Sequence, residues 1–335
     1  MKPKFAIIGC GRIAKRHAEQ IDKVGKLVAV CDIVLENAAE LAKEYDAKIY
    51  LSIEDLLINE KEVDIVSICT PNGLHAEHAI KSLKAHKHVL CEKPMSINGK
   101  DGHAMINASL IADRRLFIVK SARYNPLVAA LKKLIDDDRL GNIYSFHLNC
   151  SWNRPSAYYS ENWRGTYALD GGTLYTQFSH YIDILFWLLG EHSSLAGYRK
   201  NLHHTNSIEF EDTGAISLEM KSGAIGTIHY SINACDMNHE ICLNIVAEKG
   251  TIQLGGEFMN KLIYQQPAFI NTALITEINT SNDYGFYKGS MSKHDMVYTN
   301  VLKALKGEDN NVTDGADALK AVLFIEEFYN KIKLS

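Results

Sequence analysis

The chain has 335 residues, of which 46% are hydrophobic and 23% charged, so it is too apolar for a disordered protein. At roughly 150 residues per domain, this length suggests two domains. The 36 Lys and Arg against 40 Asp and Glu give a formal net charge of −4. This balance argues against a nucleic-acid binder, which needs a basic surface.

The sequence indicates neither a membrane protein nor a secreted one. The apolar run near the N-terminus is too short for a signal peptide, and no segment reaches the roughly 18 apolar residues of a membrane span. The seven cysteines include no CxxC pair, and we interpret them as reduced core thiols of a cytoplasmic protein. We read His203-His204 as a solvated loop and expect no metal site.

The first 120 residues alternate short apolar runs with helical patterns. The predicted strands are Phe5–Ile8, Leu27–Cys31, Ile65–Cys69, His88–Cys91 and Leu116–Val119. The predicted helices are Arg12–Val24, Val34–Tyr45, Ser52–Asn59, His75–Ala85 and Gly99–Asp113. Apolar runs of this kind are typical of strands covered on both faces, and the alternation predicts a doubly wound parallel sheet. We therefore expect an α/β fold, with a first domain over residues 1–121.

From about residue 145, apolar and polar residues alternate. We expect antiparallel hairpins with turns at Ser222-Gly223 and Glu248-Lys249-Gly250. Helices are expected over His180–Leu189, Ser292–Leu305 and Asp314–Lys331. The second domain is expected over residues 122–335, with the last helix free to pack back on the first domain.

A dinucleotide-binding motif follows the first predicted strand. In this GxGxxA motif, Gly9 permits a tight turn, Gly11 lets the backbone approach a pyrophosphate, and Ala14 permits close helix–strand packing. The helix that begins at Arg12 and Ile13 offers free N–H groups to the phosphates. The alternative is a purely structural turn.

Asp32 stands at the end of the second predicted strand, 21 residues after Gly11. A carboxylate at this spacing accepts hydrogen bonds from ribose hydroxyls and repels a 2′-phosphate. No Arg or Lys follows at positions 33–35, so the sequence favours NAD over NADP. The alternative role of Asp32 is a helix cap.

Lys93 is the first candidate for proton transfer. It stands in Glu92-Lys93-Pro94 at the end of a predicted strand, where ligands bind in such sheets. Pro94 favours an extended Lys93, and burial can tune such an amine for proton transfer. The alternatives are a surface lysine or an ion pair with Glu92.

His180 is the second candidate. Offsets of four and three residues place Thr176, His180 and Asp183 on one face of a predicted helix, where Asp183 could fix the histidine tautomer. The alternative is a satisfied structural histidine.

These motifs, with Thr70-Pro71-Asn72-Gly73-Leu74-His75, resemble those of the glucose–fructose oxidoreductase/inositol dehydrogenase (Gfo/Idh/MocA) family. The resemblance covers nearly the whole chain. It implies a Rossmann domain followed by an α/β domain with a large, mostly antiparallel open sheet, and NAD(P)-dependent oxidation or reduction of a sugar-ring carbon. It maps Lys93 and His180 onto the family's catalytic lysine and histidine.

The resemblance also implies the remaining site residues. Cofactor contacts are expected at Thr70, Asn72, His75, Glu92, Lys93, Trp163 and Arg164, in addition to Gly9, Gly11, Arg12, Ile13 and Asp32. Many polyol-oxidising members carry Asp where this chain has Thr176, which weakens an inositol-type interpretation. The family commonly forms oligomers through the sheet of the second domain, so a homodimer or homotetramer is expected.

A narrower resemblance, over Trp152–Tyr159, Trp163–Thr166 and Asp170–Gly172, is to dehydrogenases that oxidise C3 of UDP-N-acetylglucosaminuronate (UDP-GlcNAcA) for lipopolysaccharide sugars. Their Asn-Gln pair before the histidine is Thr176-Gln177 here. Substrate contacts are therefore expected at Arg123, Arg154, Tyr158, Thr176, Gln177 and His180, since arginines can bind the anionic groups of such a substrate bidentately. The alternative for each arginine is an ordinary ion pair.

Three alternative functions share this framework: a free-sugar or inositol dehydrogenase, a glycosidase that uses NAD transiently, and a non-catalytic NAD(H)-binding sensor. The sequence leaves open whether Lys93 or His180 is the base, and whether 2-oxoglutarate reoxidises the cofactor in place.

Overall fold

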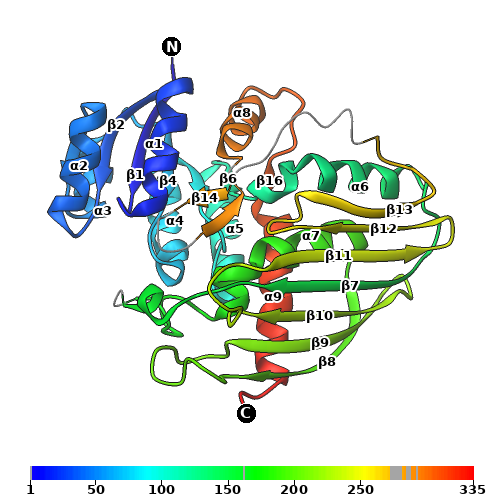
Figure 1. The fold of residues 1–335 in the computed structure, drawn as a ribbon. Helices are drawn as coiled ribbons and strands as arrows, with labels where there is room; N and C mark the ends of the chain where they lie inside the picture. Colours follow the sequence, from blue (N-terminus) through cyan, green and yellow to red (C-terminus); the bar gives the residue numbers. More distant parts are fainter. Residues whose placement is uncertain (1, 161–162, 272–280, 284–287, 292) are drawn as a thin grey trace. The chain divides into compact units, whose positions relative to one another are not determined.

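The computed structural model of the chain describes residues 2–160, 163–271, 281–283, 288–291 and 293–335 (Figure 1). The chain forms two compact units. The first comprises Met1–Lys120, Ala168–Asp170 and His294–Leu323, and the second comprises Ser121–Tyr167, Gly171–Lys293 and Phe324–Ser335. The first half of the last predicted helix belongs to the first unit, where we expected that this helix could pack, whereas the place of residues 294–305 in this unit was not expected. The boundary between residues 121 and 122 stays a prediction for the functional domains.

The first unit is built on a seven-stranded sheet in the order β16-β6-β5-β4-β1-β2-β3. Its parallel strands are β1 (Lys4–Ile8), β2 (Lys26–Cys31), β3 (Lys48–Tyr50), β4 (Ile65–Ile68), β5 (His88–Cys91) and β6 (Leu116–Ile118), and β16 (Thr313–Asp314) joins antiparallel. The strand order reverses at β1 and β4, which creates the crevice where ligands bind in doubly wound sheets. The predicted Rossmann-type sheet is confirmed.

Helices flank this sheet where the apolar periodicity predicted them. They are α1 (Arg12–Val24), α2 (Leu35–Tyr45), α3 (Ile53–Asn59), α4 (His75–Lys84) and α5 (Gly99–Ala112), with a short 3-10 helix, η1 (Asn72–Leu74). Helix α1 buries Ala14, Ala18 and Ile21 on one stripe, as its spacing predicts. Helix α8 (His294–Leu305) lies in the same unit, and α9 (Gly315–Lys331) begins there and ends in the second unit.

The second unit is built on a mostly antiparallel sheet in the order β13-β12-β11-β7-β10-β9-β8. Its strands are β7 (Ile143–Ser151), β8 (His192–Lys200), β9 (Thr213–Met220), β10 (Ile225–Ser231), β11 (Glu240–Ala247), β12 (Gly250–Gly255) and β13 (Lys261–Gln266). Both predicted hairpins, β9–β10 and β11–β12, are confirmed, while β10 pairs parallel with β7. A separate ribbon pairs β14 (Ser281–Asp283) with β15 (Lys288–Met291).

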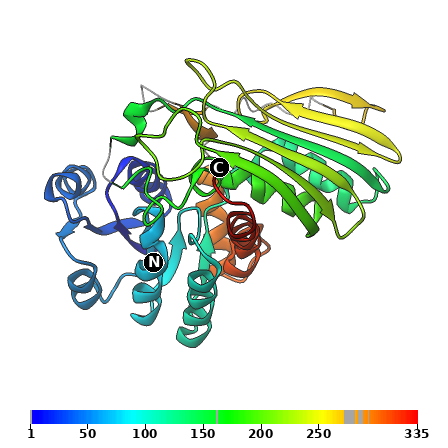
Figure 2. The ribbon, with the colours of Figure 1, turned by 90° about the horizontal axis from the view of Figure 1, so that it is seen from below.

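Helices cover one face of this sheet (Figures 1 and 2). They are α6 (Pro126–Asp136), α7 (Ser179–Leu189) and the last part of α9, while 3-10 turns η2 (Ser121–Tyr124) and η3 (Ser156–Tyr159) lie in the connections. Every residue of α7 except Trp187 is buried, which explains why an almost entirely apolar segment forms a helix here. None of the helices in the described ranges has the length and apolar character that a membrane crossing requires.

Candidate active site

The glycine loop after β1 has the geometry of a phosphate cradle. Gly9 has φ +88°, and a Cβ on it would lie 2.7 Å from the backbone of Cys69 and Thr70, so only glycine fits. Gly11 caps α1 with φ −72°, and a Cβ there would meet nothing within 4 Å. The backbone before the N–H groups of Arg12 and Ile13 is therefore open to solvent, which suits a pyrophosphate.

Asp32 follows β2 and ties this loop to the next one. Its Oδ2 accepts the backbone N–H of Cys10 at 2.7 Å, and its Oδ1 accepts that of Val34 at 2.8 Å. An ionised carboxylate has about four acceptor positions, so two remain for ribose hydroxyls. Together with the glycine loop, this arrangement fits an NAD that carries a free 2′-hydroxyl.

The segment after β4 supplies structural contacts for the three residues predicted there. The Asn72 side chain donates to the Asp170 carbonyl oxygen at 2.8 Å, and the Thr70 hydroxyl lies 3.1 Å from the ring of His78. The two ring nitrogens of His75 lie 2.8 Å and 2.6 Å from the carbonyl oxygens of Thr70 and Pro94. These contacts fix the loops at the carboxyl ends of β4 and β5. Cofactor contact by Thr70, Asn72 and His75 stays a prediction.

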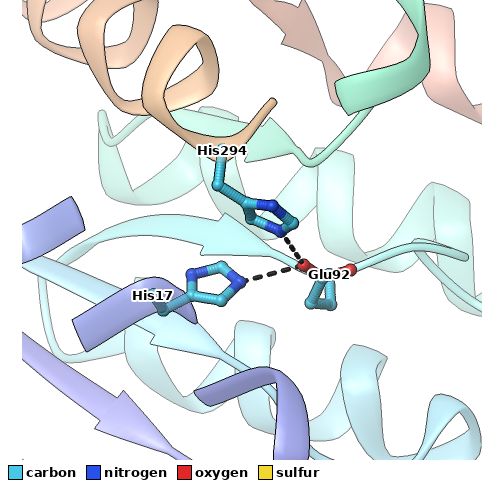
Figure 3. Close-up of side chains that lie close together, drawn as sticks. All are labelled: His17, Glu92 and His294. Atoms are coloured by element: carbon cyan, nitrogen blue, oxygen red, sulfur yellow. Dashed lines mark hydrogen bonds and ion pairs between the residues drawn. The ribbon is translucent and has the colours of Figure 1, made fainter. Parts of the chain in front are cut away.

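Lys93 lies directly beyond β5, half-buried, and its backbone N–H donates to Glu92 Oε2 at 3.1 Å. Glu92 itself is buried and contacts two histidines, His17 from α1 and His294 from α8 (Figure 3). Sequence reasoning missed both histidines. His17 shares the apolar stripe of α1, which signals a buried position, whereas nothing local marks His294.

In the second unit, a double glycine opens the segment that carries His180. Gly171 and Gly172 have φ +90° and +134°, and a Cβ on Gly172 would lie within 2.8 Å of the Tyr329 ring. The chain then forms a π-helix over Leu174–Phe178 (η4) before α7. This π turn carries Thr176, and His180 and Asp183 follow in α7, so the common face of these three residues stays a prediction.

The carboxylate of Asp183 is engaged by Arg123. The guanidinium Nε and Nη2 donate to its two oxygens at 2.7 Å and 2.8 Å, and the same guanidinium stacks 5.1 Å from the Trp187 ring. We expected Asp183 to orient His180 and Arg123 to bind a substrate anion. The structure shows a buried bidentate pair between them, and both expectations stay predictions. His180 is 4% exposed.

The structure brings together four predicted residues of the second unit. Arg154 Nε donates to Gln177 Oε1 at 2.7 Å, and Gln177 Nε2 donates to the Tyr158 hydroxyl at 3.1 Å. Arg164 donates to the same hydroxyl and stacks 4.2 Å from the Tyr158 ring and 4.4 Å from the Trp163 ring. We call Arg154, Tyr158, Arg164 and Gln177 the arginine cluster. Two guanidinium groups thus lie around one tyrosine, next to the start of α7.

Two further residues contact Arg154 of this cluster. Asn238, which sequence reasoning missed, accepts a hydrogen bond from Arg154 Nη1 at 3.1 Å. His204 Nε2 lies 2.8 Å from the Arg154 carbonyl oxygen, and His204 Nδ1 lies 3.3 Å from Asp212 Oδ2. His204 is only 2% exposed, so its assignment to a solvated loop was wrong, although His203 is exposed.

Comparisons with known proteins agree with this geometry. Residues 3–119 match the model of the oxidoreductase family with an NAD-binding Rossmann fold (GFO/IDH/MocA), and residues 128–253 match the GFO/IDH/MocA C-terminal domain. The predicted family and the predicted NAD cofactor are confirmed.

Three relatives show how similar the chain is to characterised dehydrogenases. The WlbA dehydrogenase of Chromobacterium violaceum, solved with NADH and UDP-GlcNAcA, is 34% identical, with a TM-score of 0.88 over 98% of this chain and 93% of that one. The WlbA dehydrogenase of Bordetella pertussis, solved with the same two ligands, is 33% identical, with a TM-score of 0.86 over 98% and 96%. Inositol 2-dehydrogenase of Klebsiella pneumoniae (strain 342) is 28% identical over 83% of this chain and 80% of its own length.

Proposed function

The chain belongs to the GFO/IDH/MocA family of NAD-dependent oxidoreductases, which act on sugar or polyol hydroxyls, and we propose that its own substrate is UDP-GlcNAcA, oxidised at C3. The reaction would supply a 3-keto nucleotide sugar for lipopolysaccharide synthesis. The observation that carries this proposal is the arginine cluster, in a chain that is 33–34% identical to two dehydrogenases solved with this nucleotide sugar.

The charge of the substrate is the reason for this choice. UDP-GlcNAcA carries a sugar carboxylate and a pyrophosphate, whereas inositol is neutral. Guanidinium groups are the preferred partners of such anions, because their fork of donors matches two oxygens at once. Arg164 is half-buried and stacked on two rings, so it is held in place for an incoming anion. Arg154 is buried and anchored by Gln177 and Asn238.

We assign the site residues as follows. The glycine loop at Gly9 and Gly11 and the carboxylate of Asp32 would hold NAD, which supplies the hydride acceptor when bound. Either Lys93 or His180 takes the proton from the sugar hydroxyl. Gln177 and Tyr158 contribute polar groups to the substrate side. Trp163 and Arg164 are proposed to reach toward the nicotinamide end of the cofactor as well.

A free-sugar or inositol dehydrogenase is the second candidate, favoured by the inositol 2-dehydrogenases among the relatives. It requires no anion site, so the arginine cluster would be purely structural. A non-catalytic NAD(H)-binding sensor would need neither Lys93 nor His180. These candidates predict different substrate and variant profiles.

Assembly and location complete the proposal. The face of the second sheet opposite its helices is left uncovered by the described helices and carries exposed Tyr198 and Ile225, so we propose it as the contact surface of a homodimer or homotetramer. All seven cysteines are free thiols, which supports the reducing environment of the cytoplasm. Light scattering coupled to size exclusion would give the number of subunits.

The decisive experiment is anaerobic turnover of NAD with UDP-GlcNAcA, UDP-N-acetylglucosamine and myo-inositol, followed by absorbance of reduced nicotinamide. We expect reduction with the uronate and at least 10-fold lower kcat/KM with the other two. Arg164→Gln should raise KM for the uronate about 10-fold, the usual scale for a charge-assisted hydrogen bond. Arg139→Gln is the matched control, because Arg139 is an exposed arginine that does not belong to the arginine cluster. Turnover of inositol but not of the uronate would replace this proposal with the second candidate.

A further inference from the structure

A buried cluster of two histidines and one carboxylate lies at the carboxyl end of β5 (Figure 3). His17 Nε2 and His294 Nε2 lie 2.9 Å and 3.0 Å from the same oxygen, Oε1 of Glu92. The two rings stack edge to face, 5.2 Å apart. All three residues belong to the first unit, and their side chains are at most 9% exposed. Helices α1 and α8 therefore meet on one carboxylate.

The hydrogen bonds of this cluster run in one direction. Burial acts to raise the pKa of Glu92, but hydrogen bonds from His17 and His294 hold it well below its ordinary value, so the carboxylate is ionised. Burial lowers the pKa of His17, which is then neutral and donates through Nε2. Its Nδ1 lies 2.8 Å from the Tyr298 hydroxyl, which lies 2.9 Å from that of Ser67. A series of hydrogen bonds thus leads from Ser67 through Tyr298 and His17 to Glu92.

The second oxygen of Glu92 connects the cluster to Lys93. Glu92 Oε2 accepts the backbone N–H of Lys93, while the backbone N–H of Glu92 donates to the Ile68 carbonyl oxygen of β4 at 3.0 Å. Lys93 lies outside the β5 ladder, which ends at Cys91. Glu92 thus holds the main chain of Lys93 through one oxygen, and the two histidines hold Glu92 through the other.

The contacts favour a hydrogen-bonded cluster over a metal centre. Two imidazoles and one carboxylate could ligate a divalent ion, since their ligand atoms lie within 4.8 Å of one another. However, both imidazole nitrogens approach the same oxygen at ordinary N–H···O distances, and the described residues offer three ligands where zinc takes four. A buried carboxylate with three donors is already satisfied.

We propose that His17 and His294 are positioning residues that hold Lys93 through the carboxylate of Glu92. The inference rests on the proposed function only for the catalytic role of Lys93. Shifts of about 1 Å in a reacting group can lower turnover about 100-fold. A histidine that reaches Lys93 through two successive hydrogen bonds, by way of Glu92, can therefore affect kcat.

Two substitutions of His294 distinguish the loss of its hydrogen bond to Glu92 from a change in side-chain packing. His294→Leu removes the donor to Glu92, whereas His294→Gln keeps an N–H that can reach it. We expect His294→Leu to lower kcat about 10- to 100-fold with the Kd for NAD changed less than 3-fold, and His294→Gln to recover most of the loss. In the Lys93→Met background, His294→Leu should lower turnover no further, because the two residues act as one unit.

A second readout needs no substrate. Hydrogen exchange at the Lys93 amide, resolved by fragmentation of the peptide over residues 91–95, should accelerate at least 10-fold in His294→Leu and stay slow in His294→Gln. The Glu92 amide, bonded to β4, is the internal reference. His192→Leu is the matched control, since it removes a histidine at 3.0 Å from Glu327 in the second unit. It should change neither exchange nor turnover.

Three outcomes would overturn the inference. One is unchanged exchange at Lys93 in His294→Leu. Another is a loss of turnover that multiplies with that of Lys93→Met, which would indicate an effect independent of Lys93. The third is a stoichiometric divalent metal in the purified protein, lost in His294→Leu. Failure of the proposed function would instead appear as a wild-type protein that does not oxidise UDP-GlcNAcA while its exchange pattern follows the prediction.

Discussion

Gly9 and Gly11 stand two residues apart in the same loop, and the structure predicts opposite consequences for replacing them with alanine. At Gly9, φ is +88° and the new Cβ would lie 2.7 Å from the backbone carbon of Cys69 and the backbone nitrogen of Thr70. A left-handed alanine costs about 1–2 kcal/mol, and a contact with rigid backbone adds about 1–3 kcal/mol. We expect Gly9→Ala to lower the free energy of unfolding by about 2–5 kcal/mol.

At Gly11, φ is −72° and ψ −165°, which alanine adopts freely, and no atom lies within 4 Å of the new Cβ. The free energy of unfolding should therefore change by less than about 0.5 kcal/mol. The added methyl occupies the space through which a pyrophosphate approaches the loop, so NAD should bind at least about 10-fold more weakly, which corresponds to about 1.4 kcal/mol.

Urea unfolding and calorimetric titration with NAD measure the two quantities separately. NAD binding by Gly11→Ala as tight as that of the wild type would contradict the role of Gly11 in admitting the pyrophosphate. Unfolding of Gly9→Ala at the wild-type urea concentration would contradict the steric argument for Gly9. A loss of stability in Gly11→Ala would show that the loop is closed rather than open.

Four further predictions follow from the contacts. Lys93→Met should lower kcat about 100- to 10,000-fold and leave the Kd for NAD within 3-fold, as stopped-flow and titration would show. Arg123→Leu removes the guanidinium partner of the buried Asp183 carboxylate and should lower the free energy of unfolding, measured by urea denaturation, by about 3–5 kcal/mol. Asp212→Asn should lower the free energy of unfolding by about 1–3 kcal/mol at pH 7, and this difference from the wild type should shrink as the pH falls below 4. Under native conditions Ellman's reagent should modify one thiol per chain, the exposed Cys235, and all seven after denaturation.

The sign of the pH prediction follows from the direction of the shift. Burial acts to raise the pKa of Asp212, but hydrogen bonds from His204 and from backbone N–H groups hold it below its ordinary value of 3.8. The stabilisation is therefore present above the unfolded pKa and is lost as pH falls toward the folded one. A stability difference that stays constant down to pH 2 would contradict this assignment.

Two further comparisons test the predictions for Arg123 and for the thiols. Lys133→Ala breaks an exposed ion pair with Asp137 and should cost less than about 0.5 kcal/mol, in contrast to Arg123→Leu. For the thiols, burial raises the pKa of Cys10 and Cys31 to about 12, so these two should resist modification at pH 8. Rapid native labelling of either would indicate that the glycine loop opens.

The first unit was predictable because its signals are local. The strands are continuous apolar runs, the helices carry one apolar stripe, and Gly9 and Asp32 mark the loops, so the predicted ranges match the observed ones within two residues. Strand β3 was missed because it has three half- to fully exposed residues with no apolar run. The return of α8 to this unit depends on His294 and Tyr298 packing against α1, which no local pattern encodes.

The second unit shows where sequence reasoning stops. Spacing along one helix suggested a partner for Asp183 in His180, but it could not indicate the ion pair with Arg123, which lies 60 residues away in sequence. The π turn before α7 follows a double glycine whose second member lies against the Tyr329 ring, a contact between distant segments that no local pattern encodes. Arg154, Tyr158 and Gln177 were found individually, and only the fold shows that they form one cluster.

We propose that this chain removes hydride from C3 of UDP-GlcNAcA. Incubation of the enzyme and NAD with UDP-GlcNAcA deuterated at C3, followed by mass spectrometry of the reduced cofactor, tests it most directly. We expect reduced cofactor one mass unit heavier than that formed from unlabelled substrate. Unlabelled reduced cofactor would place the oxidation at another carbon, and the absence of reduced cofactor would show that this nucleotide sugar is not the substrate.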